Sequence, residues 1–212
     1  NTGGILTMNK ISDSSTWTTV KGSATGLVAP KGIEVIDGRS ALIISDNGTK
    51  DIKVFDKNAI GDVSPLFTVA NLGGVAARNV WDTSYDNNSD TLYVAATDGV
   101  VLVYDKFFAT KGVDGPTKLI IPSNDKLEKL SINLHGIAYV PERDSIVLTD
   151  VGSATSATDG QVFTLNDVRT SSGRTITSLQ LKGANTQLGN PVDLAYDGQS
   201  IYVAEKSNDR IL

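Results

Sequence analysis

Short runs of β-branched, aromatic and aliphatic residues recur along the chain, separated by turns rich in Gly, Asp and Asn. Turn pairs such as Asp37-Gly38 and Asp159-Gly160 accept positive φ and favour tight hairpins between antiparallel strands. Helical periodicity is almost absent, and only residues 123–130 are expected to form one or two helical turns, with Ser123 as N-cap. The pattern therefore predicts an all-β fold.

The runs are organised as a repeat of roughly 50 residues. In each unit three strands follow one another closely, as at 30–35, 41–46 and 51–56. Equivalent positions close the second strand of each unit, and they are Asp46, Ala96, Asp150 and Glu205. These positions are 50, 54 and 55 residues apart, so the chain repeats one unit about four times.

A fourth, more polar strand follows in three of the units, at 64–69, 117–121 and 175–181. Residues 175–181 alternate between apolar and polar side chains, as a half-exposed outer strand does. Four antiparallel strands per repeat are typical of a β-propeller, whose four-stranded blades surround a central channel. We therefore expect one propeller domain over 1–212, with whole blades at 30–72, 78–122 and 135–182.

The two ends of the chain carry partial units. Residues 1–29 hold two predicted strands and form a half blade, whereas residues 190–212 stop as a third strand begins. About four blades are therefore visible, and we expect them to belong to a ring of five to seven blades, of which this sequence is a piece. The alternative is that a second chain supplies the missing strands.

The last unit resembles an NHL repeat. Residues 190–198 read Asn-Pro-Val-Asp-Leu-Ala-Tyr-Asp-Gly, and 201–205 read Ile-Tyr-Val-Ala-Glu. The typical repeat reads Pro-x-Gly-Ile-Ala-Val-Asp, then Tyr-Val-Ala-Asp, then Asn-x-Arg-Ile-x-Val-Phe-Asp, and residues 30–56 follow the same outline. The resemblance to NHL-repeat and SMP-30-like propellers implies the fold, and such propellers include binding modules, lactonases, lyases and scaffolds.

Composition narrows the classes of function. The chain has 19 Lys and Arg against 24 Asp and Glu, and its net charge of −5 argues against nucleic-acid binding. Its apolar runs are far shorter than a membrane span, so we expect no membrane insertion. It has no Cys and therefore no disulfide, thiolate zinc site or Cys nucleophile. With its many Thr, Ser and Asn residues, this composition favours a secreted, periplasmic or cell-surface protein.

Candidate binding residues gather where the predicted inner strands approach the channel mouth. They are Asp46, Asn79, Asp82, His135, Asp150, Asp193 and Glu205. The acids that close second strands are first interpreted as structural, because a carboxylate there accepts hydrogen bonds from the following turn. The alternative is a ring of acids that holds a cation or a basic partner. His135 is the only His, and we expect it to pack or to contact a ligand.

The resemblance also implies an enzymatic alternative. SMP-30-like lactonases hold Ca²⁺ with oxygen ligands, including an Asn in an Asn-Gly-apolar motif and an Asp in a Pro-Asp-Gly motif. In this chain His135 and Val192 occupy those two positions. A metal-dependent hydrolase on this scaffold would use Asn79, Asp150, Asp193 and His135.

We therefore expect an extracytoplasmic, NHL-like propeller that binds a protein, peptide or glycan without catalysis and without a cofactor. The first alternative is the divalent-metal-dependent hydrolase or lactonase, with Ca²⁺ as its ion. The second alternative is a structural component of a cell-surface assembly. Two weaker signals favour structural roles: the acidic segment 86–90 is interpreted as a turn, and Trp81 as a core residue.

Overall fold

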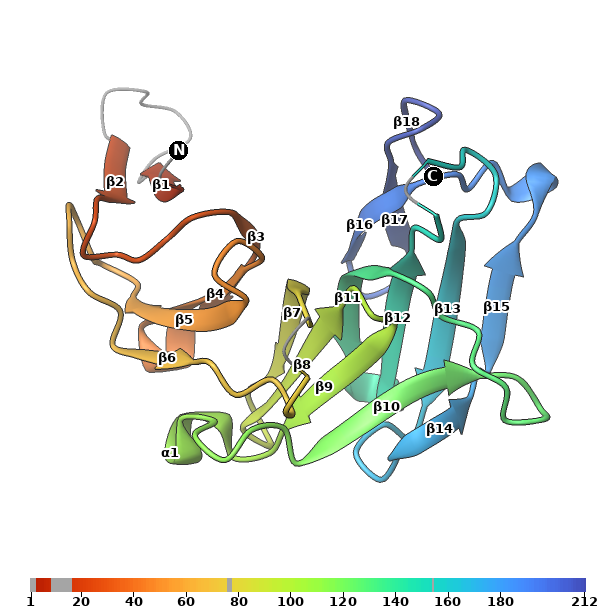
Figure 1. The fold of residues 1–212 in the computed structure, drawn as a ribbon, viewed down its shortest axis with the longest axis horizontal. Coiled ribbons are helices and arrows are strands. Elements are labelled where there is room, and N and C mark those ends of the chain that lie inside the picture. Colours follow the sequence, from red (N-terminus) through yellow and green to blue (C-terminus); the bar gives the residue numbers. More distant parts are fainter. Residues whose placement is uncertain (1–2, 9–16, 76–77, 154) are drawn as a thin grey trace.

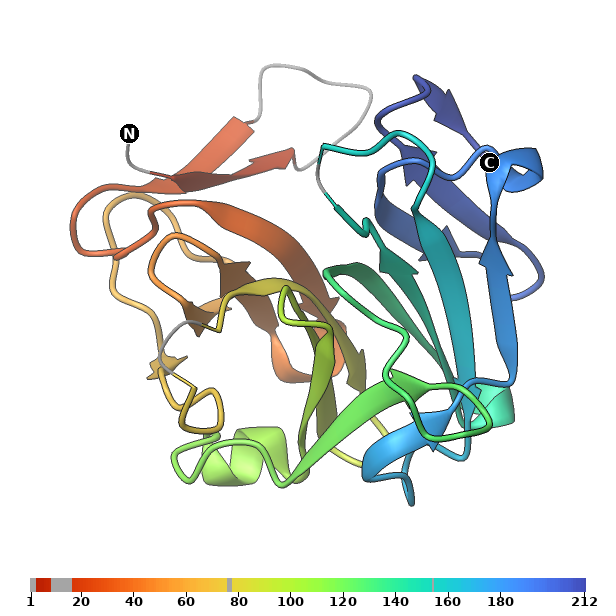
Figure 2. The same cartoon turned by 45° about the vertical axis from the view of Figure 1, so that its right-hand side comes forward.

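The computed structural model describes residues 3–8, 17–75, 78–153 and 155–212. Its five β-sheets follow one another in chain order around an arc (Figures 1 and 2). The innermost strands of the last four sheets contact one another in succession and surround the centre of the arc. The fold is a β-propeller of antiparallel blades with little helix, as the sequence predicts.

The sheets consist of the following strands. The first sheet contains β1 (Gly4–Met8) and β2 (Trp17–Lys21). The second contains β3 (Pro30–Ile36), β4 (Ala41–Asp46), β5 (Asp51–Asp56) and β6 (Phe67–Val69). The third contains β7 (Val80–Asp86), β8 (Thr91–Ala96), β9 (Val100–Tyr104), β10 (Lys118–Ser123) and β14 (Gly173–Ile176). The fourth contains β11 (Leu134–Val140), β12 (Ser145–Asp150), β13 (Gln161–Asn166) and β15 (Leu179–Lys182). The fifth contains β16 (Pro191–Tyr196), β17 (Ile201–Glu205) and β18 (Arg210–Ile211).

The helical segments in the described part of the chain are short. They are the helix α1 (Phe107–Thr110) and the 3₁₀ turns η1 (Asp37–Arg39), η2 (Pro141–Arg143) and η3 (Ala184–Thr186). No helix in the described ranges has both the length and the apolar character needed to cross a membrane.

The hydrophobic core lies between consecutive sheets. Strand β8 is buried on both faces: Leu92 and Val94 pack toward the second sheet, whereas Tyr93 and Ala95 pack toward the fourth. Because successive side chains of a strand point to opposite faces, one apolar run serves two interfaces. Full burial of an aliphatic or aromatic side chain contributes about 1.5–3 kcal/mol, so these stacked interfaces hold the blades in place.

Each inner strand of the last four sheets has a β-bulge at an equivalent place near its start. A bulge re-aims the side chains on either side of it. At this place β11 carries Gly136, whose added Cβ would lie 2.9 Å from the Cα of Asp193 and 2.8 Å from the backbone nitrogen of Leu194. The close approach of β11 to β16 therefore requires glycine at position 136.

The outer strand expected at 175–181 is wrong as a single element. It divides at Thr177 and Ser178, and only β15 joins its own blade, antiparallel to β13. The preceding residues form β14, which pairs in parallel with β10 of the neighbouring blade. The apolar–polar alternation was compatible with both pairings, because it records only that one face of a strand is exposed.

The helical turns expected at 123–130 are also wrong. The side-chain oxygen of Asn124 accepts hydrogen bonds from the amides of Lys126 and Glu128, at 3.0 and 2.8 Å. Leu127 adopts a φ of +59°. An Asn side chain that captures nearby amides offers the backbone an alternative to the helix, so the segment folds as a turn.

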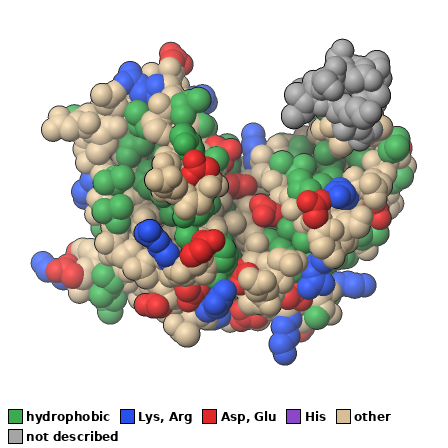
Figure 3. Space-filling model, turned by 180° about the vertical axis from the view of Figure 1, so that it is seen from behind, with side chains coloured by type: hydrophobic (Ala, Val, Ile, Leu, Met, Phe, Trp, Pro, Cys, Tyr) green, Lys and Arg blue, Asp and Glu red, His purple; other side chains and the backbone are tan. Residues whose placement is uncertain are grey.

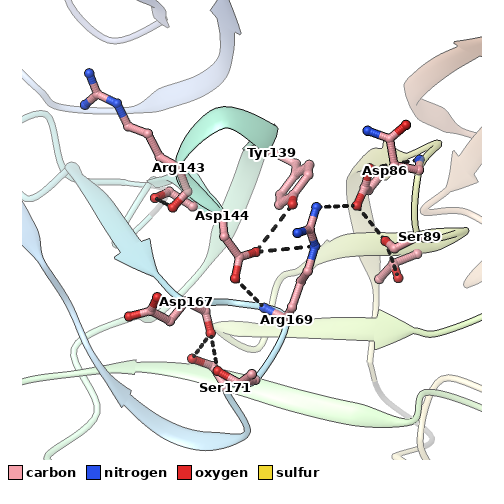
Figure 4. Close-up of polar contacts among 12 residues, drawn as sticks. Asp86, Ser89, Tyr139, Arg143, Asp144, Asp167, Arg169 and Ser171 are labelled. Atoms are coloured by element: carbon pink, nitrogen blue, oxygen red, sulfur yellow. Dashed lines mark hydrogen bonds and ion pairs between the residues drawn. The ribbon is translucent and has the colours of Figure 1, made fainter.

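An arginine in the loop after β13 ties the third and fourth sheets together (Figure 4). The guanidinium of Arg169 lies 3.1 Å from the carboxylate of Asp86 and 3.7 Å from that of Asp144. It also lies 5.7 Å from the ring centre of Tyr139. Asp86 ends β7 and is 3% exposed, so this clasp neutralises a buried carboxylate between two blades.

Candidate functional site

The inner strands line a central channel with two main cavities. The larger, about 580 Å³, is called the amide pocket, and its lining residues are Lys31, Asn47, Asn79, Trp81, Thr97, Asn133, His135, Asn190, Val192 and Lys206. The second, about 340 Å³, is called the acidic pocket, and its polar lining residues are Lys31, Glu34, Asp82, Thr83, Ser84, Tyr139, Asp193 and Tyr196. A smaller cavity of about 240 Å³ shares residues with both and links them along the channel.

Asparagines that precede the inner strands form the rim of the amide pocket. The backbone carbonyls of Asn79, Asn133 and Asn190 each accept a hydrogen bond of 3.0 Å from the residue that follows the second strand of the same blade. This shared bond fixes the backbone at each rim position and brings the side-chain amides to one mouth. The side-chain oxygens of Asn79 and Asn133 are buried and have no hydrogen-bond partner in the described structure.

A stacked aromatic pair forms the wall of the amide pocket. The rings of Trp81 and His135 lie 3.5 Å apart and nearly parallel, at 9°. The ammonium of Lys31 lies 4.8 Å from the Trp81 ring centre, within the range of a cation–π contact. Trp81 is thus half-buried at the channel, whereas the sequence favoured a core position.

His135 is neutral at physiological pH. Its side chain is 6% exposed, and its Nδ1 has no hydrogen-bond partner in the described structure. Burial, together with the positive charges of Lys31 and Lys206, lowers the pKa of His135 to about 4. A neutral imidazole keeps one nitrogen free of a proton, and that nitrogen can accept a hydrogen bond.

The acids Asp46, Asp150 and Glu205 are 2% exposed or less and lie inside the blades. The carboxylate of Asp46 accepts hydrogen bonds of 2.8 Å from the amides of Val28 and Ala29, which lead into the inner strand. Asp150 and Glu205 make the equivalent pairs of bonds, the shortest at 2.7 and 2.8 Å. Each acid also accepts a bond from its following turn. Their carboxylates are therefore committed to the backbone.

The third sheet has Ala96 at this repeated position and uses an ion pair instead. The guanidinium of Arg78 lies 2.9 Å from the carboxylate of Asp98 and donates a 2.7 Å hydrogen bond to the carbonyl of Leu72. Arg78 is 4% exposed and directly precedes Asn79 at the rim. This ion pair was not identified from the sequence. The available signal was an Arg directly before the inner strand and an Asp shortly after Ala96.

Three carboxylates occupy the acidic pocket, and acidic side chains are visible at the hollow between the two sides of the molecule (Figure 3). Burial and repulsion from Asp193 and Glu34 raise the pKa of Asp82 to about 7. Burial raises the pKa of Glu34 to about 7 and also raises the pKa of Asp193. Asp82 and Glu34 therefore exchange protons near neutral pH. Glu34 was not identified from the sequence as a site residue. The available signal was its position on an inner strand, two residues after Gly32.

The acidic pocket also contributes to the contact between inner strands. The amide of Ile137 donates a 3.1 Å hydrogen bond to the carboxylate of Asp82, and the amide of Tyr139 donates a 3.0 Å bond to the hydroxyl of Ser84. The amide of Tyr85 donates to Glu34 in the same way. Side chains of one inner strand thus satisfy backbone groups of the next strand around the channel.

The structure separates the four residues of the hydrolase alternative. Asn79 and His135 share the amide pocket, Asp193 lines the acidic pocket, and Asp150 is committed to the backbone of its blade. Over the ranges that the structure describes, no group of three or more His, Asp or Glu residues is arranged to hold a metal ion.

Comparisons with known proteins establish the fold alone. No family model matches the chain, and no curated protein matches it. Among solved structures, the chain is similar to one described as the crystal structure of a nidogen/laminin complex, with a TM-score of 0.60 and 16% sequence identity. The match covers 92% of this chain and 63% of that chain, so this chain spans less than two thirds of its length.

Proposed function

We propose that this chain is a non-catalytic binding module whose ligand enters the amide pocket. The observation that carries the proposal is the set of three buried polar atoms without a partner in the described structure: Asn79 Oδ1, Asn133 Oδ1 and His135 Nδ1. All three residues line one cavity of about 580 Å³, a size typical of ligand sites. A buried polar group left unpaired costs about 1–3 kcal/mol, so a ligand that donates hydrogen bonds there gains affinity.

The rim is held in place before a ligand arrives. The acids Asp150 and Glu205 bind the backbone amides of Asn133 and Asn190, and Arg78 precedes the third rim asparagine. The stacked rings of the aromatic wall restrict each other. Binding therefore needs little ordering of the protein, which favours affinity.

The wider setting of the proposal comes from the sequence and the fold. The repeat residues support an NHL- or SMP-30-like type of propeller, and the lack of Cys with the acidic, Thr- and Ser-rich composition supports a secreted, periplasmic or cell-surface location. The similar solved structure is described as a complex between two proteins. A protein, peptide or glycan partner fits the proposal, which requires no cofactor.

The proposal is tested by screening the immobilised chain against panels of extracellular proteins, peptides and glycans. Asn133→Ala and Asn79→Ala remove the free acceptors and should weaken any specific ligand about tenfold each. Asn87→Ala, in the exposed turn between β7 and β8, is the matched control and should leave affinity unchanged. A ligand that binds the wild type and both rim variants with equal affinity contradicts the proposal.

A turnover assay separates the enzymatic alternative. Lactone and ester substrates are incubated with the chain in Ca²⁺ and then in chelator, while thermal unfolding is followed in both. The binding module should release no product and unfold at the same temperature in both buffers. Chelator-sensitive turnover would replace the proposal with the metal-dependent hydrolase.

A further inference from the structure

The charge of the amide pocket is opposite to that of the whole chain. Two lysines, Lys31 and Lys206, line it, and among the residues that the structure describes no Asp or Glu is part of its lining. The chain as a whole carries a net charge of −5, and the neighbouring acidic pocket holds three carboxylates. Both lysines are exposed, and both act on His135 through their positive charge. An anionic group that enters this mouth therefore meets two cations and a neutral imidazole.

The remaining polar groups of the pocket are suited to hydroxyls. A side-chain amide presents an acceptor oxygen and a donor NH₂ group, and a hydroxyl can both donate and accept, so the two match in either orientation. The unpartnered oxygens of Asn79 and Asn133 need donors, which a bare carboxylate cannot provide, whereas a hydroxyl can pair with the Nδ1 of His135 in either tautomer. The ligand must therefore combine an anion with several hydroxyl groups in a compact unit.

The pocket also has room and apolar surface for a ring. Its volume is about 580 Å³, and its lining residues include Val192 and Trp81. The C–H face of a sugar ring is apolar, whereas its rim carries hydroxyls. A pyranose can thus contact Val192 and Trp81 while its hydroxyls reach the asparagines.

We propose that the ligand of the amide pocket is an acidic sugar, a pyranose or short oligosaccharide that bears carboxylates, such as a uronic acid. Lys31 and Lys206 bind the carboxylate, and Asn79, Asn133 and His135 accept hydrogen bonds from the hydroxyls. This inference rests on the proposed function and narrows its ligand class. Recognition of this kind requires both charge and hydroxyls, so each requirement can be tested separately.

The experiment uses the Trp17→Phe variant, in which Trp81 is the only Trp and its fluorescence reports on the pocket. Three probes are titrated at constant ionic strength: trigalacturonate, the neutral galactotriose, and triglutamate, which has carboxylates but no hydroxyls. Trigalacturonate should change the fluorescence saturably, and the other two should bind about tenfold more weakly or worse. Lys206→Gln should remove the preference for trigalacturonate, whereas Lys182→Gln, on the outer strand β15, should leave it intact.

Each other outcome overturns the inference. If galactotriose binds as tightly as trigalacturonate, the pocket does not recognise charge. If triglutamate binds as tightly, the pocket does not recognise hydroxyls, and this is the result expected for a peptide ligand. In both cases the pocket still binds, and the proposed function stands. If trigalacturonate fails to bind, the inference is wrong. The ligand screen, with Asn133→Ala and Asn79→Ala as test variants and Asn87→Ala as the control, then decides separately whether the proposed function survives.

Discussion

Replacement of Asp82 by Asn should stabilise the protein at pH 8. Burial and the charges of Asp193 and Glu34 raise the pKa of Asp82 from 3.8 to about 7, so the folded state resists ionisation of this carboxyl. Since a tenfold change in proton affinity is worth about 1.4 kcal/mol, ionised Asp82 destabilises the fold by at most ~4 kcal/mol. Asp82 is half-buried, so solvent screens part of this energy, and we expect Asp82→Asn to gain about 2–4 kcal/mol.

The direction of the pH dependence follows from the raised pKa. The folded state holds the proton more tightly than the unfolded state, so this contribution to stability is complete below pH 3.8 and is lost as the pH rises through about 7. Asn has no such proton, yet its oxygen can still accept the hydrogen bond from the amide of Ile137. The gain should therefore be full at pH 8 and close to zero near pH 4.

Urea unfolding of the wild type and Asp82→Asn at pH 8 and pH 4 measures the effect. Comparison at equal pH cancels the opposite contribution of His135, whose pKa of about 4 makes acid destabilising below pH 6.5. Asp114→Asn, on an exposed loop, is the control and should change the free energy of unfolding by less than about 0.5 kcal/mol. If Asp82→Asn is no more stable at pH 8, or gains equally at both pH values, the carboxyl is not strained as we describe.

Three further variants test the contacts between blades. Gly136→Ala should lose about 1–3 kcal/mol of unfolding free energy, because its Cβ meets the backbone of β16, whereas Gly38→Ala, with its nearest neighbour at 3.6 Å, should be neutral. Asp46→Asn should cost about 1–3 kcal/mol of unfolding free energy at pH 7. Backbone hydrogen bonds and Lys53 lower the pKa of the wild-type carboxyl, so the difference should disappear as acid protonates it. A loss that persists at pH 2 would contradict a charge effect. Arg169→Ala should lower the urea midpoint, more so at low salt, and Arg143→Ala should not; equal midpoints for the two variants would rule out the clasp.

The architecture was predictable because its cause is local. The apolar runs and the turns between them specify hairpins, although Gly38 and Gly160 do not adopt the positive φ expected of them. The recurrence of an acid at the end of the second strand, at Asp46, Asp150 and Glu205, specifies radial sheets. The structural interpretation of these acids agrees with the turn bonds, but their second role, holding the segment before the inner strand, joins residues 15–18 positions apart. Hydrophobic pattern carries no information on such polar, non-local contacts.

The candidate site was predicted only in part for the same reason. Asn79 and His135 were named from the sequence and share the amide pocket, but Lys31, Asn133 and Lys206 were not. Each of these comes from a different blade or loop, and only the radial order brings them together. Likewise, Glu34, Asp82 and Asp193 lie close together because their inner strands are neighbours around the channel. The three residues are far apart in the sequence, so the sequence does not show this proximity.

The strand β14 limits how far this repeat can be treated as a set of interchangeable modules. Residues Gly173–Ile176 continue the chain of one blade yet complete the edge of the preceding one, with four residue pairs in register against β10. Deleting the fourth blade together with β14 would strip β10 of its cover and leave an open edge, the kind of surface through which sheets of different molecules associate. Insertion, circular permutation or recombination at this boundary must therefore keep the third and fourth blades together as one unit.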